Sequence, residues 1–341
     1  MDRIHPMAST DCRNQTSIAD FILLGFGHVP KLQIFLFLLF LMIYIVTVAG
    51  NILIVALVVA DRHLHTPMYF FLGNLSCLET CYSSTILPRM LASLLTGDRT
   101  ISVRGCMTQF YCFAILAATE CYLLAAMSYD RYLAICNPLR YATLVNGRVC
   151  FQLVACSWTS SFLGSTIVII LMSKLIFCCS NEIDHFFCDF SPIIKLSCSD
   201  TRLLELTVLT VSSIGSLIPF LLTVASYVCI ITTILRIPSA TDRQKAFSTC
   251  SAHLVIVTVF YGTLIFVYIV PNTRPSKDLH KMFSVFYTVL TPMVNPLIYS
   301  LRNKEVKEAL RKALNKVLAF ARFQTVKCNE MGIKRSGDPW E

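Results

Sequence analysis

The chain has little charge for its length. Only 14% of its 341 residues are Asp, Glu, Lys or Arg, whereas 55% are hydrophobic and the mean hydropathy is +0.64. A soluble globular protein cannot bury so large an apolar fraction, so the composition excludes a cytosolic enzyme, a disordered protein and a small disulfide-stabilised secreted domain. In a membrane protein, the formal charge of +9 does not indicate nucleic acid as a partner.

Signatures of other membrane proteins are also missing. The sequence contains neither His-Glu-x-x-His nor Gly-x-Ser-x-Gly, which argues against a hydrolase. Its two halves show no repeat of the kind that secondary transporters carry, and the last apolar block has no lysine to hold retinal. We therefore expect no enzymatic activity, and a transporter or a light-driven pump is disfavoured.

The apolar residues form seven blocks, and each is long enough to cross a bilayer as a helix of about 20 residues. The blocks span residues 32–60, 68–95, 107–129, 149–173, 206–235, 246–273 and 282–301. Only the second, with Glu79 and Arg89, and the third, with Glu120, contain charged residues. This pattern predicts an all-α membrane protein, a seven-transmembrane helix bundle, with one domain over residues 32–301.

An odd number of spans places the two ends of the chain on opposite sides of the membrane. With residues 1–31 outside, 12 of the 29 Lys and Arg residues lie outside and 17 inside, in agreement with the positive-inside rule. A glycosylation acceptor at Asn14 and four cysteines in the loop after the fourth block favour the same orientation. Residues 1–31 lack the pattern of a cleaved signal peptide and are predicted to form an extracellular N-terminus.

The segment after the last block has a different composition. Residues 302–320 place apolar side chains at helical spacing with Lys and Arg between them, which predicts an amphipathic helix on the cytoplasmic leaflet. A solvated helical tail is the alternative. Residues 302–341 are accordingly interpreted as a cytoplasmic amphipathic helix and tail that contacts membrane lipids.

Six motifs occur in order, each at a fitting end of a block. They are Gly50-Asn51, Leu64-His-Thr-Pro-Met-Tyr-Phe-Phe-Leu72, Met127-Ser-Tyr-Asp-Arg-Tyr-Leu-Ala-Ile-Cys136, Ser226-Tyr227, Lys245-Ala-Phe-Ser-Thr-Cys250 and Pro292-Met-Val-Asn-Pro-Leu-Ile-Tyr299. Together they resemble the rhodopsin-like G-protein-coupled receptors, and the second, third and fifth resemble the olfactory (odorant) receptors in particular. The resemblance covers about residues 21–314 and implies a multi-pass receptor of the plasma membrane.

The third motif places Asp130 and Arg131 at the cytoplasmic end of its block. A guanidinium paired with a neighbouring carboxylate can be released toward a partner when the carboxylate is protonated or a helix moves. This predicts an ionic latch, and a basic flank with no moving part is the alternative. The residues implied in coupling and switching are Asp130, Arg131, Tyr132, Tyr227, Asn295, Pro296 and Tyr299. By the resemblance, the two tyrosines Tyr227 and Tyr299 approach each other when the cytoplasmic side opens.

Glu79 and Glu120 lie within spans, where a carboxylate is costly unless it is protonated, paired or hydrated. No span interior offers a basic partner, so at least one of the two is expected to be protonated or to hold a cation. In the resembled receptors, groups at these places join Asn51 and Asn295 in one polar cluster, which in some members holds a sodium ion. Two glutamic acids in a static helix contact are the alternative.

The resemblance also implies two disulfides, Cys106 with Cys188 and Cys178 with Cys198. It leaves Cys179, in the same loop, without an assigned partner. It places a ligand in the outer half of the bundle, between the third, fifth, sixth and seventh spans. The expected walls are Phe113, Ala114, Ala117, Ala118, Val211, Ser212, Gly215, Tyr261, Leu264, Ile265, Tyr268 and Thr288.

These walls are apolar and aromatic with a few hydroxyls, and they suit a small, neutral, largely apolar volatile molecule. The implied mechanism is a population shift in which the agonist favours a conformation open on the cytoplasmic side. The implied partner is a heterotrimeric G protein of the stimulatory, olfactory type, which raises cyclic AMP. A rhodopsin-like receptor for an endogenous small molecule, acting outside the nose, is the alternative.

Overall fold

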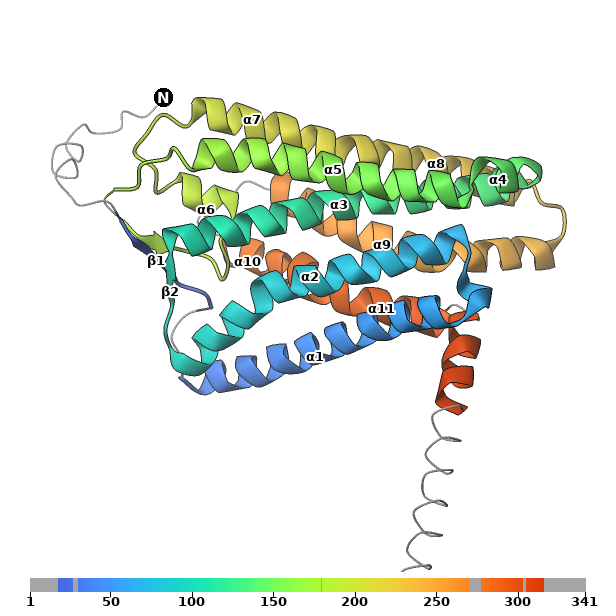
Figure 1. The fold of residues 1–341 in the computed structure, drawn as a ribbon, viewed down its shortest axis with the longest axis horizontal. Helices are drawn as coiled ribbons and strands as arrows, with labels where there is room; N and C mark the ends of the chain where they lie inside the picture. Colours follow the sequence, from blue (N-terminus) through green and yellow to red (C-terminus); the bar gives the residue numbers. More distant parts are fainter. Residues whose placement is uncertain (1–17, 27–29, 179, 270–276, 303–304, 316–341) are drawn as a thin grey trace, which may run out of the picture.

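The structure is a computed structural model of the chain, and it describes residues 18–26, 30–178, 180–269, 277–302 and 305–315. Long helices lie side by side along one direction (Figure 1). A small β-sheet lies at one end of the bundle and the short helix α4 at the other. We call these the sheet end and the α4 end.

The seven predicted blocks correspond in order to the long helical segments. The first four and the sixth are single helices: α1 Pro30–Ala60, α2 Pro67–Thr96, α3 Val103–Cys136, α5 Gly147–Met172 and α9 Ala240–Ile269. The fifth consists of α7 Arg202–Ser212, η3 Ser213–Leu217 and α8 Ile218–Leu235. The seventh consists of α10 Lys277–Val285, η5 Phe286–Leu290 and α11 Thr291–Arg302. Short helices in the connections are η2 Arg62–Leu64, α4 Pro138–Leu144 and α6 Phe190–Ile194.

Fewer than seven of the observed helices are both long enough and apolar enough to be recognised as membrane spans by these two criteria alone. Among the described residues, four helical stretches meet both requirements, and a fifth is added if the bent α9 counts as one span. We attribute the difference at α2 to its polar residues, Glu79 and Arg89 among them, and the difference at the seventh block to its division into shorter pieces. Packing within the bundle, rather than hydropathy alone, defines these two segments.

Two π-helical turns divide the fifth and seventh segments, and both end two residues before a proline. The turn η3 precedes Pro219, and η5 precedes Pro292. A proline offers no backbone N–H and its ring clashes with the carbonyl four residues earlier. The wider turn accommodates this clash, and after η5 the Thr291 hydroxyl donates a hydrogen bond to the Phe286 carbonyl at 3.1 Å.

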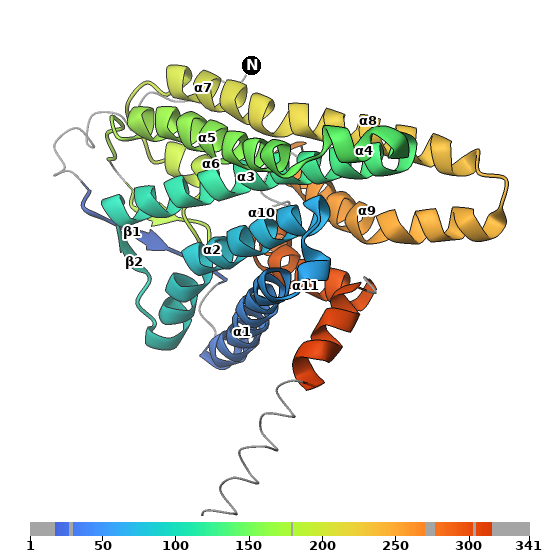
Figure 2. The ribbon, with the colours of Figure 1, turned by 45° about the vertical axis from the view of Figure 1, so that its right-hand side comes forward.

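The sheet end is closed by three short strands that the sequence analysis did not predict. The strand β1, Asp20–Leu23, lies between β2, Thr100–Ser102, and β3, Glu182–Ile183. It pairs antiparallel with β2 and parallel with β3. Its Phe21 is fully buried and packs edge-on against Phe177 of the long loop between α5 and α7. The strand β1 is thus part of the layer that packs over this end of the bundle (Figure 2).

The predicted amphipathic helix is present over residues 305–315 at the α4 end, and residues 316–320 lie outside the described part. Val306 and Ala309 are buried, and the Lys312 ammonium lies 3.7 Å from the Asp61 carboxylate that follows α1. The backbone N–H of His63 donates to this carboxylate and, together with Lys312, holds the pKa of Asp61 below its usual value. These contacts attach the helix to the connection between α1 and α2.

Two disulfides hold the long loop, and both have the pairing that the resemblance implies. Cys106, one turn into α3, is bonded to Cys188, and Cys178 is bonded to Cys198. Cys179 and the glycosylation acceptor Asn14 lie outside the described residues. The bond from Cys106 ties the long loop directly to the central helix α3.

We predict that Cys106→Ser or Cys188→Ser abolishes delivery to the cell surface, because loss of a native disulfide typically costs about 2–5 kcal/mol of folding free energy. Surface staining of an N-terminal epitope measures the effect. Cys156→Ser, at an exposed free cysteine of α5, is the matched control and is expected to behave as wild type. Normal staining of both bridge variants would show that the bond is dispensable.

Candidate functional site

An aromatic cluster occupies the sheet half of the bundle. It includes the third and seventh spans, which were expected to line the ligand site, and the second, which was not. Phe113 of α3 is buried, and its ring centroid lies 5.1 Å from Phe187 of the long loop, 5.4 Å from Tyr82 of α2 and 6.2 Å from Tyr287 of η5. Rings at these distances attract one another beyond the area that they bury. The cluster therefore joins three helical segments and the loop around one phenylalanine.

The other expected wall residues divide into an inward and an outward group. Tyr261 and Thr288 are buried, and the Tyr261 hydroxyl lies 3.4 Å from the Cys121 carbonyl of α3. Ser212 and Ile265 are exposed. The part-buried members are Ala114, Ala117, Ala118, Val211, Gly215 and Leu264, and the Tyr268 side chain lies outside the described part.

Contacts show which way two of the part-buried residues face. A Cβ atom placed on Gly164 of α5 would lie 3.0 Å from the Val211 side chain, so Val211 faces α5. A Cβ atom on Gly215 would lie 3.9 Å from the Tyr122 hydroxyl, so Gly215 faces α3. Two hollows at the sheet end, one beside Arg99 and one beside Met107, are lined by none of the expected wall residues.

A layer of buried polar groups crosses the middle of the bundle. Glu79, Glu120, Asn51 and Asn295 are each at most 2% exposed, although they come from four different spans. The Asn295 amide donates a hydrogen bond to one Glu79 carboxylate oxygen. The other Glu79 oxygen, Oε2, and Oε1 of Glu120 have no hydrogen-bond partner among the described residues. The structure thus brings together the four residues that the sequence analysis assigned to one cluster.

Asn51 has a second role that follows from Pro296. Since proline has no N–H, Pro296 leaves the carbonyl of Pro292, four residues earlier, without its helical donor. The Asn51 amide of α1 donates to this carbonyl at 3.1 Å and also to the Thr47 carbonyl at 3.1 Å. Next to Asn51 the helices come so close that a Cβ atom on Gly50 would lie 3.3 Å from the Pro296 ring.

The predicted latch lies at the α4 end of α3. Asp130 is 2% exposed, and its carboxylate is 3.9 Å from the Arg131 guanidinium. It also accepts a hydrogen bond of 2.7 Å from the Tyr141 hydroxyl of α4. The carboxylate therefore holds both the arginine and the short helix that follows α3, while Tyr132 lies part-buried beside them.

Tyr227 of α8 lies within the same end of the bundle. Its hydroxyl is 2.6 Å from Nδ1 of His253 in α9, and both side chains are buried. Tyr299 belongs to α11, but its side chain lies outside the described part, so its approach to Tyr227 stays a prediction. The contact between Tyr227 and His253 therefore lies next to the bend of 50° in α9, between Ala240–Ser248 and His253–Ile265.

Sequence reasoning missed four residues that the structure places in these layers. Tyr82 and Tyr287 were not assigned to the ligand site, because neither lies in one of the six motifs. A single aromatic residue in an apolar span gives no further indication of its role. Phe187 had a usable signal, since it precedes the cysteine that is tied to α3. His253 was not assigned either, because a lone histidine in an apolar span does not reveal its partner.

Comparison with solved structures identifies the class of fold. The crystal structure of squid rhodopsin superposes with a TM-score of 0.66 at 18% sequence identity, covering 85% of this chain and 87% of that one. The chain therefore has the seven-transmembrane helix bundle of rhodopsin, as the sequence predicted.

Sequence comparison identifies the family. The family model described as olfactory receptor matches residues 40–317. Olfactory receptor 5AP2 of Mus musculus is 49% identical over 303 residues, which are 89% of this chain and 96% of that protein. Olfactory receptor 6C4 of Homo sapiens is 46% identical over 306 residues, which are 90% and 99%. The chain belongs to the olfactory receptor family; it is a membrane receptor of the G-protein-coupled class and not an enzyme.

We predict that Asn51→Ala destabilises the protein by about 1–3 kcal/mol, because it leaves the Pro292 carbonyl buried without a donor. Thermal unfolding in lipid nanodiscs measures the loss. Asn74→Ala is the matched control, because its amide bonds only to the Phe70 carbonyl of its own helix. Equal melting temperatures for the two variants would contradict the role of Asn51.

Proposed function

We propose that this receptor binds small, neutral, largely apolar volatile molecules in the sheet half of the bundle. The aromatic cluster around Phe113 carries this proposal, because it joins α3 and η5, from two of the spans expected to line the site, with α2 and the long loop. The buried hydroxyl groups of Tyr261 and Thr288 can orient a ligand by one or two hydrogen bonds. Phe113 has no negative charge that could pair with an ammonium group, so an ammonium ligand is disfavoured.

We propose that the sheet end faces the cell exterior and that the receptor resides in the plasma membrane. The two disulfides of the long loop support this orientation, since such bonds persist in oxidising compartments. The basic helix at residues 305–315 supports it from the other side, because Lys and Arg beside a span favour the cytoplasm and its anionic lipids.

The α4 end is proposed to couple to a stimulatory, olfactory-type G protein. Two features support the contact: Arg131 at the end of α3, and Leu139 of α4, which is 98% exposed. An exposed leucine beside a releasable arginine suits a partner helix with mixed apolar and polar character. The Tyr141 hydroxyl, through Asp130, keeps α4 oriented next to the arginine.

Activation is proposed to be a population shift. The agonist binds better to the conformation that is open at the α4 end, and α9 swings at its bend so that Arg131 becomes accessible. In the resting state, at least one of Glu79 and Glu120 is protonated, or the two carboxylates hold a sodium ion. Both options follow because each glutamate has a buried oxygen without a hydrogen-bond partner among the described residues.

A screen of chemically diverse volatiles on cells with a cyclic AMP reporter tests the function. We expect neutral apolar molecules to activate the receptor in a concentration-dependent way. A receptor that reaches the surface but responds only to charged or non-volatile compounds would contradict the ligand class, and responses through another second messenger would contradict the proposed G protein.

We predict that Arg131→Ala abolishes the agonist-driven cyclic AMP response without lowering surface expression, because Arg131 is proposed to act only in the latch and the G-protein contact. Arg148→Ala, at an exposed arginine of α5, is expected to respond like wild type. An undiminished response in Arg131→Ala at matched surface levels would remove Arg131 from the mechanism.

We predict that Glu120→Gln changes basal cyclic AMP or shifts agonist potency at least several-fold. The amide keeps the shape but cannot carry charge, and a change of about 1.4 kcal/mol between resting and active states alters their ratio tenfold. Glu205→Gln, at an exposed glutamate of α7, serves as the control. If basal activity, potency and sodium sensitivity all match wild type, the two glutamates form a static contact.

A further inference from the structure

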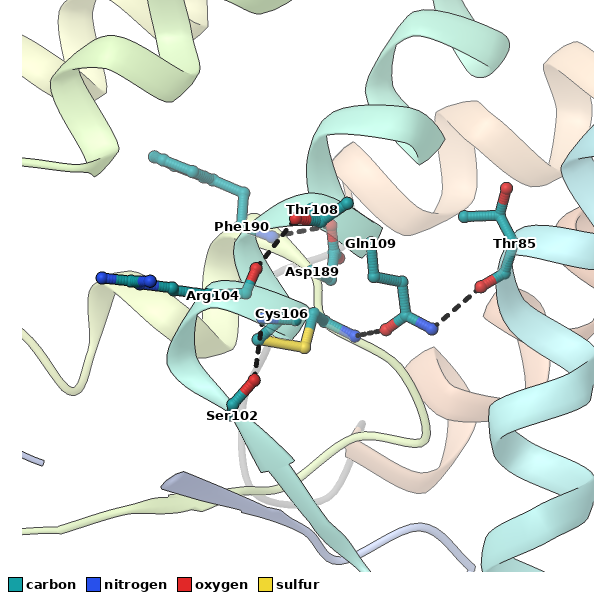
Figure 3. The surroundings of a disulfide bond; sticks show 10 residues. Thr85, Ser102, Arg104, Cys106, Thr108, Gln109, Asp189 and Phe190 are labelled. Carbon is teal, nitrogen blue, oxygen red and sulfur yellow. Dashed lines mark hydrogen bonds between the residues drawn. A yellow bond between two sulfur atoms is a disulfide. The ribbon is translucent and has the colours of Figure 1, made fainter. Parts of the chain in front are cut away.

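Gln109 of α3 links the long loop to α2 near the disulfide. Its amide oxygen accepts a hydrogen bond of 3.0 Å from the backbone N–H of Cys188 in the long loop. Its amide nitrogen donates a hydrogen bond of 3.1 Å to the Thr85 carbonyl of α2. Figure 3 shows the side chain lying between these two partners, one turn along α3 from Cys106. Gln109 is 8% exposed, so water competes little for either bond.

The two bonds satisfy a buried donor in the long loop and add a contact to the turn of α2 that precedes Pro88. Cys188 is fully buried, and a buried N–H without an acceptor is destabilising. Pro88, inside α2, has no N–H and therefore cannot donate to the Ser84 carbonyl, next to Thr85 in the same turn. Within a bilayer, the carbonyls of such a turn accept bonds from neighbouring helices. The glutamine amide matches this pair because it is donor and acceptor at once.

The same three elements carry three rings of the aromatic cluster. Tyr82 precedes Thr85 by three residues, Phe113 follows Gln109 by four, and Phe187 precedes Cys188 by one. Residues three or four apart share a helix face, so the ring contacts lie one turn deeper than the amide bonds. The rings of Tyr82 and Phe187 both contact Phe113. The spacing between loop and α2 at Gln109 is thereby transmitted to the proposed ligand site.

We propose that Gln109 is a positioning residue that sets the width and selectivity of the ligand site by fixing the long loop against the proline turn of α2. The disulfide holds the side chain of Cys188 near α3, and by itself it does not set the orientation of the loop backbone there. The hydrogen bond to Cys188 fixes this orientation, and the bond to Thr85 fixes the α2 wall relative to it. The selectivity part rests on the proposed function, whereas the positioning part does not.

The first experiment needs no ligand. Gln109→Met keeps the length and packing of the side chain but removes both hydrogen bonds, and Gln109→Asn keeps the amide but is too short to reach both partners. Amide hydrogen exchange is followed by mass spectrometry for peptides containing Cys188, in receptor purified into lipid nanodiscs with the disulfide verified as intact. Gln152→Met, at an exposed glutamine of α5, is the matched control.

We expect exchange at the Cys188 amide to rise about fivefold or more in Gln109→Met, as the loss of one hydrogen bond implies, and to rise in Gln109→Asn. Gln152→Met should exchange like wild type. Exchange that is unchanged in both Gln109 variants would overturn the proposal. Because the second variant retains a polar group, the comparison stands even if Gln109→Met fails to accumulate.

The second experiment tests selectivity with straight-chain primary alcohols of four to ten carbons on reporter cells. At matched surface levels, Gln109→Met is expected to reduce the potency ratio between the best and the second-best alcohol by about fivefold, within the range that pocket fit supplies. Uniform loss of potency with an unchanged ratio would overturn the selectivity role. If wild type answers none of these alcohols, the ratio is measured for the two best neutral volatiles of the screen. If it answers no neutral volatile at all, the proposed ligand class fails, and hydrogen exchange still decides the positioning role.

Discussion

Backbone carbonyls at prolines dominate the architecture, because lipid offers no water to replace the donor that a proline lacks. Two carboxamides from neighbouring helices bond to carbonyls in such proline turns, and one of them replaces the missing donor itself. Asn51 of α1 bonds to the Pro292 carbonyl left open by Pro296, and Gln109 of α3 bonds to the Thr85 carbonyl beside Pro88. Each bond fixes one helix against another at a defined depth. The places where the helices bend are therefore also the places where they are joined.

The central helix α3 carries all three layers of the site. Phe113 lies in the aromatic cluster, Glu120 in the polar layer and Arg131 at the α4 end, over roughly 27 Å at 1.5 Å rise per residue. Because one continuous helix spans these layers, a signal along the bundle requires that the surrounding segments move relative to α3. The bend of α9 and the π-helical turns of the fifth and seventh segments supply the irregular geometry where such movement can occur.

The order and number of long helical segments could be predicted from apolar block length alone. Glu79 and Glu120 could also be singled out, since a glutamate inside a span usually has a functional role. Their association with Asn51 and Asn295 was implied by the family resemblance alone. The strand β1 could not be predicted, because four residues with little pattern form a strand only when two loops supply partners. The sequence also did not show that Val211 faces α5, because that contact is known only once the two helices are packed. The bridging role of Gln109 required knowledge of which carbonyl lies opposite it.

The coupling between the two ends of the bundle is measured most directly as a distance. Spin labels introduced as non-natural amino acids at Leu144 of α4 and Gln244 of α9, both exposed, report the opening of the α4 end. With an agonist from the volatile screen and G protein, the account predicts a new population at longer distance, and the agonist alone should increase it in part. A distance distribution that stays unchanged while cyclic AMP rises would contradict the account.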